Sequence, residues 1–426
     1  MTLSAVARFL YTLLFTLLLP VIVLRLWWRG RKNPGYRQRI GERFGLIPHR
    51  PQPGGLWLHA VSVGETLASA PLVKAFQQKH PNIPLIITTT TPTGSEQVRR
   101  LFGQQVYHMY LPYDLPWFMN RFIRSIRPGL LLIMETELWP NLLACCEEQK
   151  VPVVLANARL SEKSAAGYEK FAALTQPMLQ RLSRVAAQHR NDGERFLALG
   201  LEESRLEITG SVKFDVSVPA DCDEKGTALR NEWGNERRVL ALASSHPEED
   251  EQLLDLYPAL QQQFPDLVLL LIPRHPERFD PVVNAAHSRQ LKVQRRSKGP
   301  ATSDTQVYVA DTMGEMLQLL AAADLVVMGG SLIPHGGHNP IEPAALGKAT
   351  LTGPHYTNFA AIVDTLKEEG GMDIIPAVSQ SKAVISRYLA DSGLRDAMGA
   401  QARATVEANK GAVARLLATC EEFLRL

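Results

Sequence analysis

Several common features are scarce or missing in this sequence. There are only four cysteines in 426 residues, their spacing matches no metal site, and the adjacent pair Cys145 and Cys146 is unable to form an ordinary unstrained disulfide. We therefore expect a reducing compartment and assign the folded part to the cytoplasm. The formal net charge of +3 is too small to indicate a nucleic-acid partner. The sequence contains no Gly-x-x-x-x-Gly-Lys-Ser/Thr segment, which argues against a P-loop NTPase.

The composition and the spacing of apolar runs predict an α/β protein. Hydrophobic residues make up 45% of the chain and charged residues 21%, and the length suits two to three domains at roughly 150 residues each. Short apolar runs alternate with helical patterns, which is typical of parallel sheets covered on both faces. We expect strands at residues 56–61, 84–89, 129–134 and 151–156, and again at 238–243, 267–272, 307–310 and 324–328. The polar stretch 216–226 separates the two series, so the sequence predicts two Rossmann-like domains that face one another across a cleft.

The N-terminus carries a long apolar run. No charge occurs between Phe9 and Leu24, and sixteen helical residues at about 1.5 Å each make roughly 24 Å, short of a ~30 Å hydrocarbon core. Extension to Trp28, with Arg25 snorkelling, brings the helix close to spanning length. No signal-peptide cleavage site follows it. We interpret residues 1–30 as a membrane anchor, either spanning or lying in the interface, rather than as a buried core helix.

Basic residues crowd behind this apolar run. They are Arg25, Arg29, Arg31, Lys32, Arg37, Arg39 and Arg43, with Glu42 as the single acid among them. Positive charge beside a membrane helix favours the cytoplasmic side and contact with anionic lipid head groups. The rest of the chain is therefore expected on the cytoplasmic side of a membrane.

Residues 323–347 combine a short apolar strand, a glycine-rich loop and an abrupt helix start. Asn339 is a good N-cap, Pro340 suits the first helical position, and Glu342 lies three residues after the cap. Free backbone N–H groups and the positive end of a helix dipole favour a phosphate at such a start. A phosphate site and a merely well-capped helix explain the pattern about equally well.

Charged side chains at other strand ends are candidates for chemistry. Glu65 opens the helix after the first strand, where a carboxylate is either stabilised by the helix dipole or placed to act as a general base. Glu135 and Glu137 follow the third strand, and their i, i+2 spacing predicts that only one of them faces a site. Lys213 ends the first half of the chain, and a lone lysine is usually a solvated surface charge.

The second half of the chain gathers groups that suit a nucleotide phosphate. Arg274 follows the strand at 267–272 and can grip phosphate oxygens through two hydrogen bonds. Residues 313–315 form a further glycine turn that opens a helix. A metal site is the competing interpretation of His335 and His338, but two histidines without a third ligand nearby are a weak signal. We expect the strand-end groups to converge on one crevice.

Six blocks of sequence, together with the N-terminal run, carry a resemblance that covers essentially the whole chain. The blocks are His-Ala-Val-Ser-Val-Gly-Glu (59–65), Met-Glu-Thr-Glu-Leu-Trp-Pro (134–140), Gly-Ser-Val-Lys-Phe-Asp (210–215), Ile-Pro-Arg-His-Pro-Glu-Arg-Phe (272–279), Asp-Thr-Met-Gly-Glu (311–315) and Gly-Gly-Ser-Leu-Ile-Pro-His-Gly-Gly-His-Asn-Pro-Ile-Glu-Pro-Ala (329–344). In these blocks and their order the chain resembles the 3-deoxy-D-manno-octulosonic acid (Kdo) transferases of lipopolysaccharide assembly. It departs from the family at Glu248, where a glycine is more common, which leaves the conformation of that loop open.

The resemblance implies a GT-B fold and an inverting glycosyltransferase that moves Kdo from CMP-Kdo onto a lipid A precursor, lipid IVA, at the bacterial inner membrane. It implies no required metal and no cofactor. It further implies Glu65 as the general base, with Glu135 and Lys213 stabilising the transition state. The implied CMP-binding residues are Pro273, Arg274, Met313, Gly314, Glu315, Asn339, Pro340, Ile341 and Glu342. An anchor fits this activity, because the acceptor's acyl chains hold it in a bilayer whose anionic surface is a further partner.

We expect an anchor at residues 1–30, an acceptor-binding domain at 31–215, a linker at 216–226 and a donor domain at 227–426. The terminal helix of the donor domain is a candidate to pack back on the acceptor domain. Two other classes of function stay open. One is a GT-B relative acting on another nucleotide sugar, such as a UDP-sugar transferase or epimerase. The other is a membrane-tethered protein that binds a nucleotide sugar without catalysis.

Overall fold

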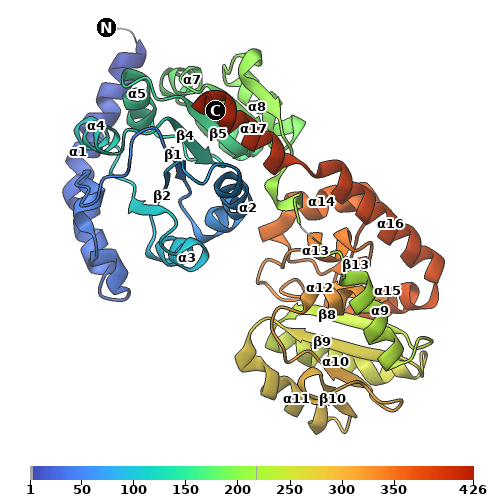
Figure 1. Ribbon diagram of the computed structural model, residues 1–426. Coiled ribbons are helices and arrows are strands. Elements are labelled where there is room, and N and C mark those ends of the chain that lie inside the picture. Colours follow the sequence, from blue (N-terminus) through green and yellow to red (C-terminus); the bar gives the residue numbers. More distant parts are fainter. Residues whose placement is uncertain (1–2, 217) are drawn as a thin grey trace. The chain divides into compact units, whose positions relative to one another are not determined.

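The computed structural model describes residues 3–216 and 218–426, and the chain divides into two compact units (Figure 1). Unit 1 comprises the chain up to Asp215 together with Lys410–Leu426, and unit 2 comprises Val216–Asn409. Each unit is built around its own parallel sheet. Along the chain, unit 2 is therefore an insertion into unit 1.

Unit 1 contains a seven-stranded sheet in the order β3-β2-β1-β4-β5-β6-β7, in which every neighbouring pair is parallel. Its strands are β1 (Leu56–His59), β2 (Leu85–Thr89), β3 (Tyr107–Tyr110), β4 (Leu130–Met134), β5 (Val153–Ala158), β6 (Arg184–Ala187) and β7 (Leu206–Ile208). Successive side chains point to opposite faces, so Trp57 lies in one core cluster while Leu56 and Leu58 lie in the other. Because both faces are covered, the central strands are near-continuous hydrophobic runs.

Helices cover both faces of this sheet. One face carries α4 (Pro116–Ile126), α5 (Pro140–Glu148), α7 (Ala172–Gln180) and α8 (Arg190–Ala198). The other face carries α2 (Val63–Lys79), α3 (Pro92–Phe102) and α17 (Ala412–Leu424). The connections also contain α6 (Glu162–Glu169) and the 3-10 turns η1 (Pro34–Arg37), η2 (Ile40–Phe44), η3 (Glu203–Arg205) and η4 (Val212–Phe214).

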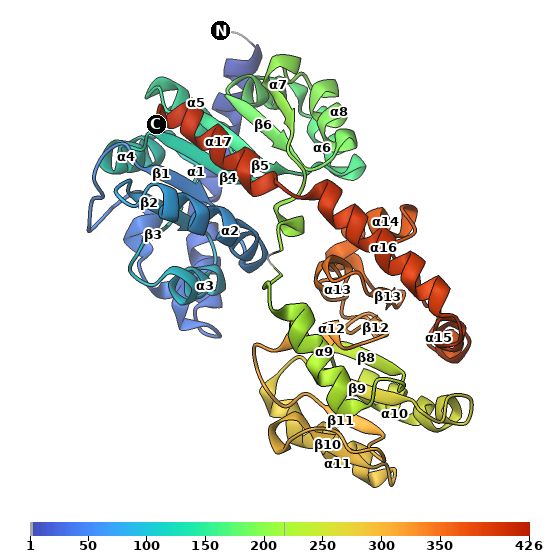
Figure 2. The same ribbon diagram turned by 45° about the vertical axis from the view of Figure 1, so that its right-hand side comes forward.

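The C-terminal helix α17 completes unit 1, and Figures 1 and 2 both show it in red beside β4. Asp215 holds its start, because the Asp215 carboxylate accepts hydrogen bonds from the N–H groups of Gly411 (2.6 Å) and Val413 (2.5 Å). The Arg415 guanidinium donates to the carbonyl of Thr209 at 2.7 and 2.9 Å. The last helix of the chain thus belongs to the first Rossmann-like unit.

Unit 2 contains a second seven-stranded parallel sheet, in the order β10-β11-β9-β8-β12-β13-β14. Its strands are β8 (Val239–Ser245), β9 (Val268–Pro273), β10 (Val293–Arg295), β11 (Val307–Val309), β12 (Leu325–Met328), β13 (Ala349–Thr352) and β14 (Asp373–Ile374). One face is covered by α9 (Cys222–Trp233) and α12 (Met316–Ala321), and the other by α10 (Pro247–Gln261), α11 (Phe279–Ser288), α15 (Ser381–Ala390) and α16 (Ser392–Asn409). Figure 2 shows α9 and α10 on either side of β8 and β9. Helices α13 (Ile341–Ala345) and α14 (Ala360–Glu368) and the turns η5 (Pro276–Arg278), η6 (Arg296–Lys298), η7 (Thr357–Phe359) and η8 (Val378–Gln380) lie in the connections.

Two local features at the start of unit 2 differ from the sequence expectation. Helix α9 begins at Cys222, which is buried, so residues 222–226 of the expected linker are helical. Glu248 is exposed in the first turn of α10, where its backbone is helical. A helical backbone does not require the glycine that is more common at this position.

Helix α1 (Leu3–Arg29) is an apolar helix that lies against unit 1. It is long and apolar enough to cross a membrane, with a mean hydropathy of 2.2. Arg8 lies 3.9 Å from Glu148, and Thr12 and Asn141 exchange two hydrogen bonds of 3.0 and 3.2 Å. The rest of the helix surface forms an exposed apolar stripe, which consists of Phe9, Leu10, Leu13, Leu14, Leu17, Leu18, Val21 and Leu24.

The basic cluster expected behind α1 divides into structural and exposed members. Arg43 is only 4% exposed, and its guanidinium lies 4.2 Å from the centre of the Tyr110 ring. Arg39 donates a hydrogen bond of 2.9 Å to the Ser95 hydroxyl. The side chains of these two arginines take part in the packing of unit 1. The exposed basic side chains are Arg25, Arg29, Arg31 and Lys32.

Candidate active site

The two units place their candidate residues at equivalent points of their sheets. In unit 1 the strand order reverses direction between β1 and β4; Glu65 follows β1 and Glu135 follows β4. In unit 2 the reversal falls between β8 and β12; His246 follows β8, and the loop 329–340 follows β12. We call these places the switch points. Ligands of open parallel sheets bind there, outside the carboxyl ends of the strands.

Glu65 lies in the first turn of α2 and is 8% exposed. The Ser62 hydroxyl donates to its Oε1 at 2.7 Å, and the Val61 N–H donates to its Oε2 at 2.8 Å. Burial raises the pKa of Glu65 above its usual range, these hydrogen bonds lower it, and the negative charge of Glu135 raises it further. A carboxylate has about four lone-pair sites, so Glu65 retains the capacity to accept a proton from a substrate hydroxyl.

Glu135 and Glu137 both act electrostatically on this site. Burial raises the pKa of Glu137, and the charges of Glu65 and Glu135 raise it further. The backbone of Glu135 is left-handed, with a φ of 58°, and its N–H donates to the carbonyl of Ala156 at 2.9 Å. The chain leaves the extended conformation at Glu135, so strand periodicity does not decide which of the two carboxylates faces the site.

Lys213 lies half-buried in the turn η4, which packs against α2, the helix that begins at the Glu65 site. The turn is held by Asn157, whose side-chain oxygen accepts a hydrogen bond of 3.1 Å from the N–H of Val212. Asn157 is fully buried and has a φ of 52°. Asn157 is a positioning residue that the sequence motifs do not include, although a polar residue inside the apolar strand β5 is a signal that could reveal it.

The candidate nucleotide-binding residues follow three strands of unit 2, β9, β11 and β12. Pro273 ends β9 and pairs with Ser245 at the end of β8, and the exposed Arg274 donates its N–H to the Ser245 carbonyl at 3.1 Å. Residues 313–315 follow β11, and residues 339–342 follow β12. Because β11, β9, β8 and β12 are adjacent and parallel, all these residues lie at one edge of the sheet.

The helix after the glycine-rich loop begins one residue later than the sequence predicts. Helix α13 spans five residues, Ile341–Ala345, and its N-cap residue is Pro340. Asn339 still shapes this start, since its side-chain oxygen accepts a hydrogen bond of 3.1 Å from the Ile341 N–H. A helix of this length has few aligned peptide dipoles. The helix dipole is therefore a weaker reason to expect a phosphate here than the sequence indicated.

The two acids of these segments have different surroundings. Glu315 accepts hydrogen bonds from the Arg296 guanidinium at 3.1 and 3.3 Å, which lower its pKa. Burial raises the pKa of Glu342, and the positive charge of Arg274 partly offsets this. The ion pair with Arg296 thus holds Glu315 in the turn at residues 313–315, in which Gly314 has a φ of 84°. Glu342 instead lies within electrostatic range of the arginine that is the candidate phosphate ligand.

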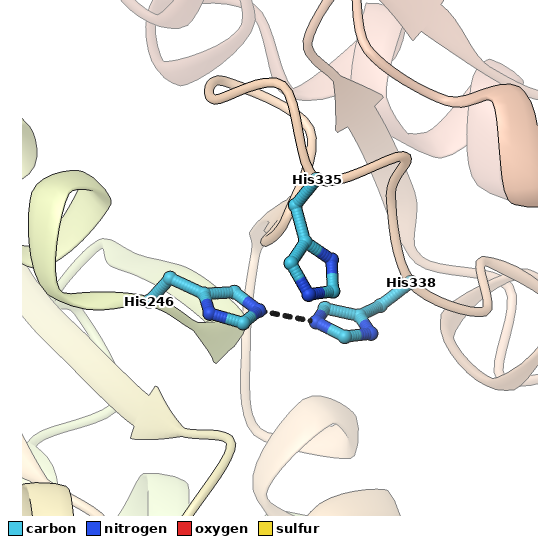
Figure 3. Close-up of side chains that lie close together, drawn as sticks. All are labelled: His246, His335 and His338. Carbon is cyan, nitrogen blue, oxygen red and sulfur yellow. Dashed lines mark hydrogen bonds between the residues drawn. The ribbon is translucent and has the colours of Figure 1, made fainter. Parts of the chain in front are cut away.

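A third histidine joins the two that the sequence offered as metal ligands (Figure 3). His246 Nε2 lies 2.9 Å from His338 Nε2, and the ring centres of His246 and His335 are 4.2 Å apart. Burial lowers the pKa of His338 to about 4, and the charges of His246 and Arg274 contribute to this shift. His246 lies far from the other two in the sequence, so spacing alone did not reveal it.

Comparison with known proteins identifies the family. Residues 38–216 match the family model described as 3-Deoxy-D-manno-octulosonic-acid transferase (kdotransferase). The chain is 39% identical to the 3-deoxy-D-manno-octulosonic acid transferase of Haemophilus influenzae, over 98% of this chain and 99% of that protein. The chain belongs to the Kdo transferase family. The transferase of the same name from Bordetella pertussis is 36% identical, again over 98% of this chain and 99% of that protein.

Two solved structures share the fold of this Kdo transferase at low sequence identity. MurG of Acinetobacter baumannii is 12% identical with a TM-score of 0.57, over 88% of this chain and 100% of that one. The UDP-GlcNAc 2-epimerase of Neisseria meningitidis is 13% identical with a TM-score of 0.56, over 86% of this chain and 100% of that one. The two parallel-sheet units are those of a GT-B fold. The protein is a glycosyltransferase, and Kdo transfer in lipopolysaccharide assembly is its activity.

Proposed function

We propose that this Kdo transferase moves Kdo from CMP-Kdo onto a lipid A precursor, lipid IVA, with inversion at the anomeric carbon. The observation that supports the proposal most is the buried Glu65 carboxylate at the unit 1 switch point, whose pKa is raised. A sugar hydroxyl is a weak nucleophile, and a carboxylate that accepts its proton increases its reactivity. The acceptor oxygen bonds to the anomeric carbon as the bond to the CMP phosphate breaks, and Glu65 takes the hydroxyl proton. Attack from the face opposite the leaving group inverts the carbon.

Glu135 and Lys213 stabilise the charges that develop during this step. The anomeric carbon becomes more positive as its bond to the leaving group lengthens, as in other glycosyl transfers, and the Glu135 carboxylate favours that charge. Lys213 offers positive charge for the phosphate that leaves. The turn that carries Lys213 is held by Asn157 and packs against the Glu65 helix, which supports a shared role for these residues.

The donor is held by unit 2 through the residues at the ends of β9, β11 and β12. Arg274 binds the CMP phosphate through its guanidinium, the geometry that suits two parallel hydrogen bonds to phosphate oxygens. Pro273 and residues 313–315 and 339–342 complete the CMP site at the same sheet edge. A single phosphate carries less charge than a diphosphate, so arginine and lysine suffice and the transfer step requires no metal.

Helix α1 attaches the enzyme to the cytoplasmic face of the bacterial inner membrane. Its contacts with Glu148 and Asn141 hold it along unit 1, while its exposed apolar stripe faces away. A helix with one docked and one apolar side suits insertion in the plane of the membrane. The four exposed basic residues at its end attract anionic lipid, and the attachment brings the enzyme to an acceptor held in the bilayer.

The proposed reaction is tested with labelled CMP-Kdo and a tetra-acylated lipid A precursor in detergent. We expect label in the lipid product, and a mass increase of whole Kdo units measured by mass spectrometry. UDP-sugars with the same acceptor are the parallel reaction and should give no product. If transfer from CMP-Kdo does not exceed background while a UDP-sugar gives product, CMP-Kdo is excluded as the donor. That result would favour a GT-B enzyme that acts on a UDP-sugar.

Membrane attachment is tested by placing charge on the stripe. The triple variant Leu10→Asp, Leu14→Asp, Leu17→Asp removes side chains that each contribute about 1.5 kcal/mol or more on burial, so we expect it in the soluble fraction after cell lysis. Val378→Asp is the matched control, because Val378 is an exposed apolar residue of unit 2, and it should stay with the membranes. Membrane retention of the triple variant would show that the stripe is not the attachment.

A further inference from the structure

Three imidazole side chains converge at the unit 2 switch point (Figure 3). The nearest ring nitrogens of His246, His335 and His338 all lie within 4.8 Å of one another. We propose that these three histidines form a binding site for a divalent transition-metal ion of the Zn²⁺ class. The site goes beyond the proposed transfer reaction, which is carried by side chains alone.

A buried carboxylate holds the two segments that supply these histidines. Glu249 is fully buried, and its oxygens accept hydrogen bonds from the N–H groups of Gly330 (2.7 Å), Ser331 (3.0 Å) and Leu332 (3.0 Å), at the start of the loop with His335 and His338. The same carboxylate accepts a hydrogen bond of 3.2 Å from the N–H of His246. One side chain therefore fixes the backbone on both sides of the cluster. Metal-binding side chains keep a precise position and orientation when hydrogen bonds fix the backbone that carries them.

Gly330 leaves the space into which the rings extend. Its φ is +67°, and a Cβ at this position would lie 3.1 Å from His338 Nε2 and 3.3 Å from His335 Nδ1. Two ring nitrogens from different residues thus meet over the same bare Cα. The carbonyl of Gly330 accepts a hydrogen bond of 2.7 Å from the Gly337 N–H, which closes the loop around this space.

The chemistry of the three side chains selects the class of ion. Imidazole nitrogen is a preferred ligand of Zn²⁺, Co²⁺, Ni²⁺ and Cu²⁺, whereas Mg²⁺ and Ca²⁺ prefer oxygen. The Nε2 atoms of His246 and His338, 2.9 Å apart, are unable to turn two lone pairs toward each other unless a proton or a cation lies between them. Metal–nitrogen bonds of about 2.0–2.1 Å place tetrahedral ligands roughly 3.3 Å apart. The distance between His246 Nε2 and His338 Nε2 is already close to this spacing, and no two ligand nitrogens of the cluster are more than 4.8 Å apart.

The cluster is also open to solvent on one side, as a site that exchanges its metal ion with solution must be. His335 is exposed, whereas His246 and His338 are half-buried, so an ion enters from the His335 side. Three protein ligands leave a fourth position of the tetrahedron for water or another oxygen donor. Asn339, a candidate donor-binding residue, directly follows His338, so the ion would lie next to the segment proposed to hold CMP.

The proposal is tested by titrating full-length protein without a polyhistidine tag with Co²⁺ and recording the visible absorption of the ion. We expect the spectrum of four-coordinate Co²⁺ with nitrogen and oxygen ligands, one ion per chain, and displacement by Zn²⁺. His338→Ala should weaken binding by at least about 10–100-fold, the loss caused by removing even an outer partner of a metal ligand. His287→Ala is the matched control, because His287 is exposed on α11 of the same unit, and it should bind as the wild type does.

A second variant separates loss of the site from loss of the fold. His335→Ala removes an exposed ring and is expected to fold, so weakened Co²⁺ binding in this variant supports the proposal even where His338→Ala is unstable. No four-coordinate spectrum in the wild type, or equal affinities in His335→Ala and His287→Ala, would overturn it. The titration contains no sugar nucleotide or lipid, so its outcome is independent of whether Kdo is transferred. The transfer assay run with a chelator tests the proposed reaction alone.

Discussion

The switch points of the two units have the same backbone architecture and opposite chemistry. In unit 1 the charge of Glu135 raises the pKa of both Glu65 and Glu137, and the charge of Glu65 also raises the pKa of Glu137. In unit 2 the corresponding loops carry His246, His335 and His338, which offer imidazole nitrogens in place of carboxylates. A parallel sheet with helices on both faces provides the switch point as a binding position. The few residues that follow each strand determine which ligand binds there.

The two switch points also differ in how their loops are held. Asn157 holds the Lys213 turn of unit 1 through one hydrogen bond to the Val212 N–H. In unit 2 the carboxylate of Glu249 accepts hydrogen bonds from Gly330 and the two residues that follow it. A charged acceptor with several N–H partners is the stronger device. This contrast between a side-chain amide that holds one N–H group in unit 1 and a carboxylate that holds several in unit 2 can be tested by substitution.

The largest effect is expected from Glu65→Gln, which removes the proposed base with little change in shape. Loss of a general base costs about 10²–10⁴-fold in rate, so Kdo transfer should fall by that factor while CMP binding and thermal stability stay near the wild type. The measurement is the initial rate of labelled transfer at saturating substrates. Glu96→Gln, at an exposed position of α3 in the same unit, is the control. Similar rates for both variants would remove Glu65 from the role of base.

Glu249→Ala is expected to loosen unit 2 without touching the chemistry of unit 1. It leaves three buried N–H groups without their acceptor, at about 1–3 kcal/mol each, so local stability should drop by at least about 3 kcal/mol. Asn157→Ala removes one such acceptor and should cost about 1 kcal/mol. Hydrogen exchange of the amides at 330–332 and at 212 measures the two losses. Equal protection changes in the two variants would contradict the contrast drawn here.

Arg274→Ala is expected to weaken CMP binding about 10–100-fold, because a hydrogen bond to a charged group contributes about 1.5–3 kcal/mol. Arg274→Lys keeps the charge but not the forked geometry, so its affinity should lie between that of the alanine variant and the wild type. Isothermal titration with CMP gives the dissociation constants. If Arg274→Ala binds CMP with the affinity of the wild type, the Arg274 side chain does not take part in binding the nucleotide.

The smallest effect is a shift in the pH profile of Glu135→Gln. The charge of Glu135 raises the pKa of Glu65, and the base works only when ionised, so activity is lost as the pH falls through that pKa. Removing the charge lowers the pKa of Glu65, and the acidic limb should therefore move to lower pH. The profile of kcat/KM, scaled to its own maximum, separates this shift from any loss of rate. An unmoved limb would mean that the two carboxylates act independently.

The sequence predicts most of the sheet but only part of the site. Strands such as β4 and β8 are confirmed because buried parallel strands are continuous apolar runs. Short strands with polar residues, such as β10 (Val293–Arg295) and β14 (Asp373–Ile374), carry no such signal and were missed. Glu65 and Arg274 were predicted as site residues because each directly follows a recognisable strand, and their roles stay predictions. The approach of His246 to His335 and the left-handed backbone at Glu135 depend on tertiary packing, which periodicity does not encode.

The return of α17 to unit 1 sets an order of events during synthesis. The ribosome synthesises the whole of unit 2 before Lys410–Leu426. The Asp215 carboxylate therefore meets the N–H groups of Gly411 and Val413 only when the chain is nearly finished. The part of one sheet face that α17 covers, beside the helix that carries Glu65, therefore stays uncovered while the inserted unit folds. The unit whose synthesis begins first is thus the last to be completed.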